Sequence, residues 1–269
     1  LEYLDLLLPM GISFYTFQGL SYVIDVFRGE VKAERNLFRI ALYIALFPQL
    51  VAGPIVRYTT IAGELRNRQE SWENFEQGVI RFLFGLAKKV LLANSFAQIA
   101  DSIFAQASDQ LSTSAAWLGV VAYTLQIYFD FSGYSDMAIG LGRIFGFHFL
   151  ENFNYPYIAI SIKDFWRRWH ISLSTWFRDY VYIPLGGNRG SKGKHLRNLL
   201  IVWGLTGFWH GAAWTYLLWG IYYAVLLIGE RYIWGEILGK LPKVVQHVYA
   251  LFFILIGWLI FRAVDINQI

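Results

Sequence analysis

The sequence predicts an all-α protein that crosses the membrane several times and contains helices broken within the bilayer. Its 269 residues are 56% hydrophobic and 19% aromatic, with only 16% charged residues. Such an excess of Trp and Tyr suits a chain with many membrane interfaces. Residues 199–229 hold no Asp, Glu, Lys or Arg, and about 20 apolar residues are enough to span the hydrocarbon core. We expect roughly seven to nine membrane segments in total.

Five further apolar runs predict membrane segments outside residues 199–229. Pro48 and Pro54 interrupt the second run, and a proline inside a span frees backbone groups that neighbouring helices must satisfy. The third run carries three basic residues, so it forms either one span or two shorter segments. Asp130 and Asp136 lie in the fourth run, and we interpret them as structural hydrogen-bond partners because their spacing does not bring them to one helix face. The five runs are residues 4–27, 42–56, 75–100, 115–149 and 244–264.

The uncharged run of residues 199–229 is too long for one upright helix and too short for two complete spans. Three glycines crowd its middle, where we expect two helical pieces to meet near residues 208–211. Irregular backbone at that depth is tolerated where it is buried in protein or lines a cavity. His210 lies at the expected break, and an ionisable residue inside a membrane indicates a functional site. The alternative is a histidine that satisfies one interhelical hydrogen bond.

The basic region, residues 163–197, contains eight Lys and Arg against two Asp, a net charge of +6. Short loops rich in Lys and Arg stay on the cytoplasmic side, so we expect this region to be cytoplasmic. Residues 163–182 have a helical period that predicts an amphipathic helix in the membrane interface. This helix is either a plain anchor or a basic mouth for an anionic substrate such as a nucleotide phosphate. One face carries Phe165, Trp169, Leu173, Trp176 and Tyr180, and the other carries Arg167, His170, Ser174 and Arg178.

Several function classes lack their sequence signals. The chain has no cysteine, which rules out disulfides, Cys metal ligands and a Cys nucleophile. The histidines form no zinc-binding pattern, and neither a Gly-x-Ser-x-Gly elbow nor a Gly-x-x-x-x-Gly-Lys phosphate loop occurs. The basic residues cluster at one membrane face, so we expect no nucleic-acid partner. His148 and His247 fall at predicted segment ends, where we expect solvent exposure, and His195 belongs to the basic region.

Four stretches of the sequence together resemble the membrane-bound O-acyltransferases, in particular the bacterial alginate O-acetyltransferase branch. Residues 208–214 read FWHGAAW, and residues 165–174 read FWRRWHISLS and continue to a PLGG run at residues 184–187. These motifs are highly specific in combination. Residues 9–18, PMGISFYTFQ, and residues 49–57, QLVAGPIVR, support them. The resemblance covers nearly the whole chain.

The resemblance implies a multi-pass fold around a central tunnel that opens toward both sides of the bacterial inner membrane. It implies transfer of an acetyl or other acyl group from a cytoplasmic thioester donor, such as acetyl-CoA. The acceptor would be a polysaccharide hydroxyl or a periplasmic or extracellular acetyltransferase partner, as in alginate and exopolysaccharide O-acetylation. The family usually has further helices before and after this region. Residues 1–269 would therefore be a single membrane-embedded acyltransferase core, a fragment that lacks N- and C-terminal helices.

The resemblance also implies roles for individual residues. The family's invariant membrane histidine matches His210, and a second, more variable polar position matches His170, so we expect both in the catalytic site. A neutral imidazole can take the proton of the acceptor hydroxyl, and an already activated thioester demands no metal. Because the chain has no Cys, direct transfer is simpler than an acyl-enzyme, although an acyl-histidine relay is an alternative. The residues expected to bind substrate or wall the site are Arg167, Arg178, Ser174, Trp209 and Trp214.

Two alternative readings of the sequence stay open. The D-alanyl transferases of the same superfamily carry a similar Trp-His-Ile/Met-Ser-Leu-Ser run, so D-alanyl transfer from a carrier protein to teichoic acid is an alternative. A transporter, or a structural subunit of a polysaccharide secretion complex, is an alternative of another class. Transporters with broken helices often show internal repeats, and none is evident here.

Overall fold

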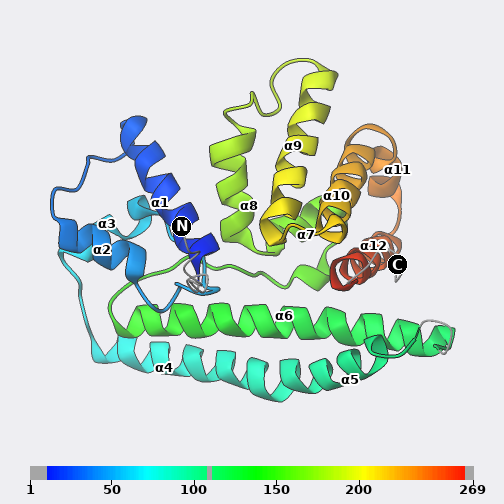
Figure 1. Cartoon of the computed structure of the whole chain (residues 1–269), viewed down its shortest axis with the longest axis horizontal. Helices are drawn as coiled ribbons and strands as arrows, with labels where there is room; N and C mark the ends of the chain where they lie inside the picture. Colours follow the sequence, from blue (N-terminus) through cyan, green and yellow to red (C-terminus); the bar gives the residue numbers. More distant parts are fainter. Residues whose placement is uncertain (1–10, 108–110, 264–269) are drawn as a thin grey trace, which may run out of the picture. The chain divides into compact units, whose positions relative to one another are not determined.

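The computed structural model describes residues 11–107 and 111–263, and all regular elements in these ranges are helices, as the sequence predicts. The chain divides into two compact units. Unit 1 contains residues up to Leu86 together with Gly133–Glu151, and unit 2 contains Ala87–Ser132 together with the residues from Asn152 onward. The long helix α6 (Thr113–Ile144) contributes residues to both units (Figure 1).

Unit 1 has a small aromatic core, and α4 packs closely against α6 within it. A Cβ atom added to Gly78 on α4 would lie 2.7 Å from the carbonyl oxygen of Gly140 on α6, so this close approach requires glycine. Small residues allow such close approach between helices in membranes. The core side chains are Tyr43, Leu46, Val56, Tyr58, Ile61, Phe147 and Phe149. Besides part of α6, the helices are α1 (Ile12–Phe27), α2 (Leu37–Ala45), α3 (Tyr58–Arg66) and α4 (Trp72–Ala87), of which Ala87 belongs to unit 2.

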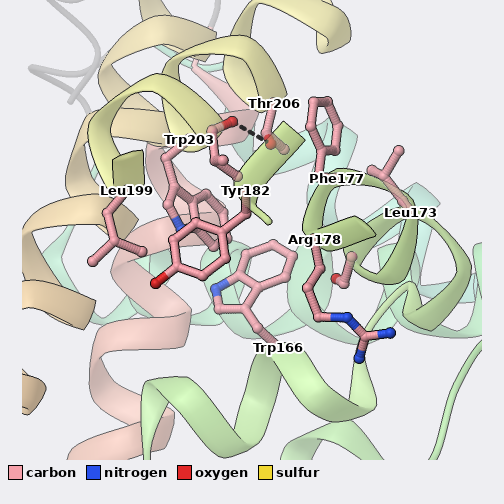
Figure 2. A pocket seen from close by; sticks show the side chains of 10 residues that line it. Trp166, Leu173, Phe177, Arg178, Tyr182, Leu199, Trp203 and Thr206 are labelled. Atoms are coloured by element: carbon pink, nitrogen blue, oxygen red, sulfur yellow. Dashed lines mark hydrogen bonds between the residues drawn. The ribbon is translucent and has the colours of Figure 1, made fainter. Parts of the chain in front are cut away.

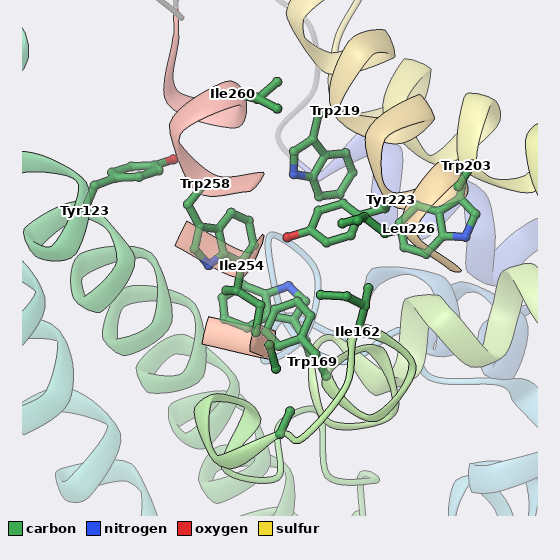
Figure 3. Close-up of a cluster of buried hydrophobic side chains, with 14 of the residues drawn as sticks. Tyr123, Ile162, Trp169, Trp203, Trp219, Tyr223, Leu226, Ile254, Trp258 and Ile260 are labelled. Atoms are coloured by element: carbon green, nitrogen blue, oxygen red, sulfur yellow. The ribbon is translucent and has the colours of Figure 1, made fainter. Parts of the chain in front are cut away.

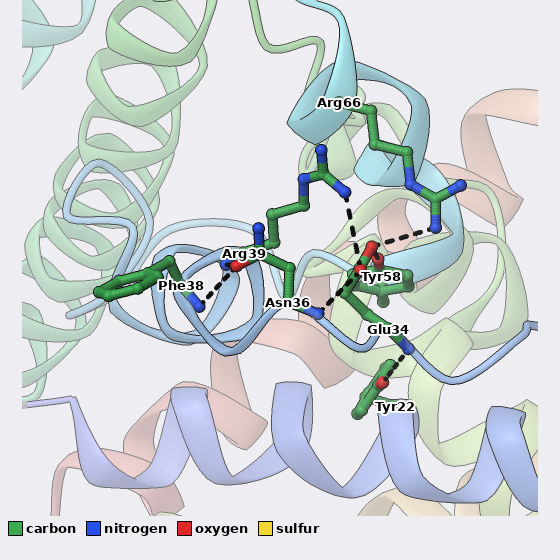
Figure 4. A network of polar contacts seen from close by, with 7 residues as sticks. All are labelled: Tyr22, Glu34, Asn36, Phe38, Arg39, Tyr58 and Arg66. Carbon is green, nitrogen blue, oxygen red and sulfur yellow. Dashed lines mark hydrogen bonds and ion pairs between the residues drawn. The ribbon is translucent and has the colours of Figure 1, made fainter.

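The link between α1 and α2 is fixed by the carboxylate of Glu34, whose side chain is 6% exposed (Figure 4). The hydroxyl of Tyr58 and the guanidinium of Arg66 both donate to its Oε2 atom at 3.0 Å. The backbone N–H of Asn36 donates to its Oε1 atom at 3.1 Å. The Asn36 hydrogen bond, followed by those from Arg66 and Tyr58, lowers the pKa of Glu34 to about 2. One carboxylate therefore ties the link to α3, and Tyr22 of α1 accepts from the Glu34 N–H at 2.9 Å.

Unit 2 is organised around a buried aromatic cluster (Figure 3). The ring centroids of Trp169 and Trp258 are 4.6 Å apart, and those of Trp219 and Tyr223 are 5.3 Å apart. Three long helices supply most of this cluster, namely α9 (Lys192–His210), α10 (Trp214–Tyr232) and α12 (Lys243–Arg262). The shorter elements are a π-helical segment at Lys88–Ala93, α5 (Asn94–Phe104), a 3₁₀ turn at Pro156–Ile158, α7 (Ile162–Arg168), α8 (Ile171–Phe177), a second π-helical segment at Arg178–Tyr182 and α11 (Gly235–Lys240).

The expected break within residues 199–229 is confirmed. Helix α9 ends at His210 and α10 begins at Trp214. The two helices then pack against each other, because Gly207 and Gly220 carry no side chain where they approach backbone carbonyls of the facing helix. The helical run expected near residues 244–264 is also confirmed, by α12.

The remaining apolar runs give a mixed outcome. Residues 75–100 are continuously helical, because a π-helical segment joins α4 to α5. The run at residues 4–27 is helical from Ile12, while residues 4–10 lie outside the described residues. The acidic residues of α6 pair as expected, Asp130 with Lys89 and Asp136 with Arg81.

Among the described residues, α12 is the one helix that is both long and apolar enough to cross a membrane, with a mean hydropathy of 2.1. The larger number of spans expected from the sequence stays a prediction.

The single amphipathic helix expected over residues 163–182 is wrong. The structure has α7, a break at Trp169 and His170, and then α8, which continues into the π-helical segment. The expected apolar face is nevertheless buried: Phe165, Trp169, Leu173, Trp176 and Tyr180 are each at most 8% exposed.

Candidate active site

His210 is the last residue of α9, at the turn that leads into α10. A Cβ atom added to the following residue, Gly211, would lie 2.7 Å from the ring of Tyr216, so the turn needs glycine there. The imidazole is half-buried among aromatic side chains. The ring centroids of Trp209, Phe261 and Trp219 lie 4.6, 5.0 and 5.1 Å from that of His210. An ionisable group at a helix break thus packs among aromatic rings, and Trp209 is one of the two residues expected to wall it.

His170 occupies the break between α7 and α8, and only 2% of it is exposed. Its backbone has φ 45° and ψ 54°, in the left-handed region that residues other than glycine rarely adopt. Its Nδ1 atom lies 3.2 Å from Oδ1 of Asn152, and its ring packs edge-on against Phe131, with 4.6 Å between the centroids. Strained backbone of this kind costs about 1–3 kcal/mol and concentrates at functional sites.

The expected place of His170 on one continuous helix face with Arg167 and Arg178 is therefore wrong, and the reason is a hydrogen-bond acceptor from another part of the chain. The carbonyl of Asn152 accepts from the backbone N–H of Ile171 at 2.9 Å. The side-chain oxygen of Asn152 accepts from the N–H and the hydroxyl of Ser172, at 3.2 and 2.9 Å. These bonds satisfy backbone donors at the start of α8. A new helix therefore begins at a point where the spacing of apolar residues predicts that the first helix continues.

Trp209 connects the two histidines. Its ring centroid is 4.6 Å from that of His210 and 6.2 Å from that of His170. The structure thus brings three of the expected site residues into one group, from the end of α9 and from the break between α7 and α8.

A mostly apolar cavity of about 160 Å³, which we call the aromatic slot, adjoins the same elements (Figure 2). It contains two of the expected substrate-binding residues, Ser174 and Arg178. The hydroxyl of Ser174 donates to the carbonyl oxygen of Trp169 at 3.5 Å. The lining side chains are Trp166, Leu173, Ser174, Phe177, Arg178, Tyr182, Leu199, Val202, Trp203 and Thr206.

A second cavity of unit 2, which we call the polar cavity, has a volume of about 750 Å³. Arg167 lines this cavity, so the two expected donor-binding arginines lie on different cavities. Its cationic and acidic lining side chains are Lys163, Arg167, Arg231, Glu230 and Glu236, and His195 also lines it. Glu230 accepts from the backbone N–H groups of Ile162 and Lys163 at 2.6 and 3.0 Å, so this carboxylate caps α7.

Two other expected site residues differ from their predicted surroundings. Arg178 already forms a pair with its neighbour Asp179, with distances of 2.6 and 3.1 Å. Trp214 is 75% exposed, so the described part of the chain does not make it a wall around His210. His195 of the basic region is 4% exposed and lies in α9, and its Nδ1 atom is 2.7 Å from the hydroxyl of Tyr232.

The partner of His170, Asn152, could not be identified from the sequence. Asn152 is completely buried, yet it follows an acidic residue in a polar stretch and carries no motif of its own. Its one sequence signal is the capacity of an Asn side chain to cap a helix, and here it caps a helix that begins 19 residues later. In the described ranges no group of three or more His, Cys, Asp and Glu side chains is arranged to hold a metal.

Comparisons with known proteins show which proteins the chain is similar to. The chain is 50% identical to the probable alginate O-acetylase AlgI of Azotobacter vinelandii over 97% of its own length and 52% of that protein. It is 37% identical to the peptidoglycan O-acetyltransferase of Helicobacter pylori, over 99% of the chain and 56% of that protein. It is 30% identical to the teichoic acid D-alanyltransferase of Bacillus subtilis, over 94% and 68%.

The chain spans about half the length of the alginate O-acetylases that it matches. A sequence model of the membrane-bound O-acyltransferase family matches residues 30–261, which include both histidines, Trp209 and the two cavities. This chain therefore belongs to the membrane-bound O-acyltransferase family.

Proposed function

We propose that this chain is the catalytic core of a membrane-bound O-acetyltransferase in the bacterial inner membrane. The donor is a cytoplasmic thioester, acetyl-CoA, and the acceptor is a hydroxyl of a polysaccharide or of a periplasmic or extracellular acetyltransferase partner. The relatives at about 50% identity are named for alginate O-acetylation, which supports a polysaccharide as the acceptor. The observation that carries the proposal is the group formed by His210, Trp209 and His170 at two helix breaks.

In the proposed mechanism His210 is the general base. Its neutral imidazole takes the proton of the acceptor hydroxyl as the oxygen attacks the thioester carbonyl. The carbon–sulfur bond then breaks, and the proton passes to the leaving thiolate, so the products are an ester and a free thiol. Side-chain bases of this kind contribute about 10²–10⁴-fold to a rate. The apolar rings around His210 keep out water that would otherwise hydrolyse the thioester.

His170 has a supporting part in this mechanism. Its buried ring is oriented by Asn152 and touches Trp209, which in turn touches His210. We assign it the orientation of the donor or the acceptor rather than proton removal.

The two cavities supply the proposed donor site. Arg167 in the polar cavity is exposed, so its guanidinium can meet a phosphate of the donor. The aromatic slot, which includes Ser174 and Arg178, suits the uncharged part of a thioester. Because Asp179 already pairs with Arg178, we assign Arg178 a smaller share of phosphate binding than Arg167.

The proposed setting is a multi-pass protein with a central tunnel that connects the two sides of the membrane. The net charge of +6 over residues 163–197 supports a cytoplasmic position for this region. It contains Arg167 and Arg178, so the donor would enter from the side on which thioesters are made. We propose a single membrane-embedded core that works within a longer protein.

The second candidate is D-alanyl transfer from a carrier protein to teichoic acid. The observation in its favour is the match to the teichoic acid D-alanyltransferase of Bacillus subtilis, at 30% identity. The higher identity to the alginate O-acetylases favours acetyl transfer. A transporter or a purely structural subunit would have no use for a base beside a thioester site.

Donor consumption tests these proposals. The full-length protein, in proteoliposomes with its acceptor-side partner, is supplied with acetyl-CoA, and release of free thiol is followed over time. An acetyltransferase consumes donor and releases thiol, whereas a transporter or structural subunit leaves the thioester intact. Consumption of D-alanyl carrier protein without consumption of acetyl-CoA would establish the second candidate instead.

A further inference from the structure

The aromatic slot and the polar cavity are neighbours. Two side chains, Tyr182 and Leu199, line both of them. In Figure 2, Tyr182 and Leu199 lie on the side of the slot away from Arg178. We call these two shared side chains the partition between the aromatic slot, which is mostly apolar, and the polar cavity, which is charged.

The side chains that line the two cavities match the two ends of a phosphate-bearing thioester, one end charged and the other uncharged. The aromatic slot is walled by rings such as Trp166, Trp203 and Phe177. The polar cavity contains the cations Lys163, Arg167 and Arg231. One of its two acids, Glu230, is already engaged by backbone N–H groups of α7. An anionic head group suits the larger chamber, and an uncharged arm that ends in a thioester suits the smaller one.

The partition is held in place by a hydrogen-bonded latch. The hydroxyl of Tyr182 donates to Oδ1 of Asn188 at 2.6 Å, and Nη1 of Arg231 donates to the same oxygen at 3.1 Å. Asn188 lies in a glycine-rich loop in which Gly186, Gly187 and Gly190 all have positive φ. A single amide oxygen thus links the end of the π-helical segment, the loop and α10.

We propose that Tyr182 is a positioning residue at the junction of the two cavities, where the arm of the thioester donor passes from the polar cavity into the aromatic slot. Asn188 fixes the Tyr182 ring, so the latch sets the width of the passage. This inference rests on the proposed function, since it assigns a path to the donor of that reaction. It adds Tyr182 and Asn188 to the residues that decide how well a donor binds.

The test compares variants of the full-length protein in the thiol-release assay, with acetyl-CoA and with S-acetylpantetheine, which has no nucleotide. Tyr182→Phe removes the latch and keeps the ring, while Asn188→Ala removes the acceptor oxygen. We expect each to raise the KM for acetyl-CoA by about three- to tenfold, the usual scale of one hydrogen bond, with kcat within about twofold of wild type. The double variant should match Asn188→Ala alone, because both changes remove the same bond.

Two further variants separate the head group from the arm. Arg167→Gln should raise the KM for acetyl-CoA and leave the KM for S-acetylpantetheine unchanged, because Arg167 lines the polar cavity and takes no part in the latch. Tyr182→Ala should raise both KM values, because the ring borders the path of the arm. Tyr222→Phe is the matched control: it removes a tyrosine hydrogen bond of 2.7 Å, to the carbonyl of Phe253, from a residue that lines neither cavity.

The outcomes are decisive in different ways. If the wild-type protein neither binds coenzyme A nor releases thiol, the proposed function fails and the inference fails with it. If the wild-type protein turns over but the KM values of the Tyr182 and Asn188 variants equal those of Tyr222→Phe, only this inference is overturned. Fully additive effects of Tyr182→Phe and Asn188→Ala would likewise overturn the shared latch.

Discussion

Replacement of His210 by Gln is the most informative perturbation of the proposed site. Glutamine is similar in length and keeps hydrogen-bonding capacity, but it cannot take a proton from a hydroxyl. Because His210 ends α9 and is only half-buried, we expect the folded protein to accumulate normally. His210→Ala removes the same base and also empties the space between Trp209, Phe261 and Trp219.

The expected loss can be set against the expected cost in stability. Loss of a general base lowers a rate by about 10²–10⁴-fold, which is about 2.7–5.4 kcal/mol of transition-state free energy. A polar substitution at a half-buried helix end changes stability by about 1 kcal/mol or less. The loss of activity in His210→Gln should therefore be far larger than any loss of folded protein.

The assay is thiol release per folded molecule, with the folded fraction measured by size-exclusion chromatography of detergent-purified protein. The matched control is His148→Gln, which changes an exposed histidine that pairs with Glu64 in unit 1. We expect the control to retain wild-type turnover and both His210 variants to lose at least about 100-fold. Retention of most activity in His210→Gln would falsify the assignment of the base.

Four further predictions follow from the same structure. Asn152→Ala should reduce turnover by about 10-fold or more, because His170 loses its orienting partner and the start of α8 loses an acceptor; an unchanged rate would contradict that role. Glu34→Gln should lower the melting temperature equally at pH 6 and pH 8. The carboxylate has a lowered pKa of about 2, so its stabilisation is complete above the ordinary value of 4.5 and is lost only as the pH falls toward 2; a difference between the two pH values would argue against it. A cysteine at Ser191 should react with an impermeant thiol reagent only from the cytoplasmic side, and labelling only from outside would reverse the proposed topology. Gly220→Leu should sharply reduce the yield of folded protein, because its side chain would meet the carbonyl of Trp203 across the α9–α10 contact; normal yield would show that this contact tolerates a gap.

The helix break at His210 was predictable because glycines and the length of an uncharged run act locally. The all-helical class was predictable from local sequence information of the same kind. So was the role of Asp130 and Asp136 as structural partners of other side chains. Residues 163–182 show the limit of periodicity: the apolar spacing continued through the break between α7 and α8, and its face is buried as expected. The break itself depends on Asn152, a distant acceptor that the local pattern does not contain.

The same limit applies to the cavities. Arg167 and Arg178 share a face in the helical pattern, but the break and the turn into the π-helical segment place them on different cavities. Arg178 also pairs with the neighbouring carboxylate of Asp179, which helical spacing alone does not reveal. Tyr182 and Asn188 carry no motif, and the role proposed for them depends on a hydrogen-bonded contact that also includes Arg231 of α10.

The π-helical segment at Lys88–Ala93 makes the region between α4 and α5 unusually tolerant of the loss of one residue. An α-helix turns by about 100° per residue, and a π turn accommodates one extra residue without lengthening the helix by a full turn. Deletion of one residue there would let the backbone relax into a regular helix. Because the π turn absorbs that residue, the relaxed helix would keep the orientation of α5, with Phe96 stacked on Phe129 and Asp101 paired with Arg262. Natural relatives should therefore accept the loss of one residue within this segment far more readily than within the regular turns of α4 or α5, where the same loss would rotate the rest of the helix by about 100°.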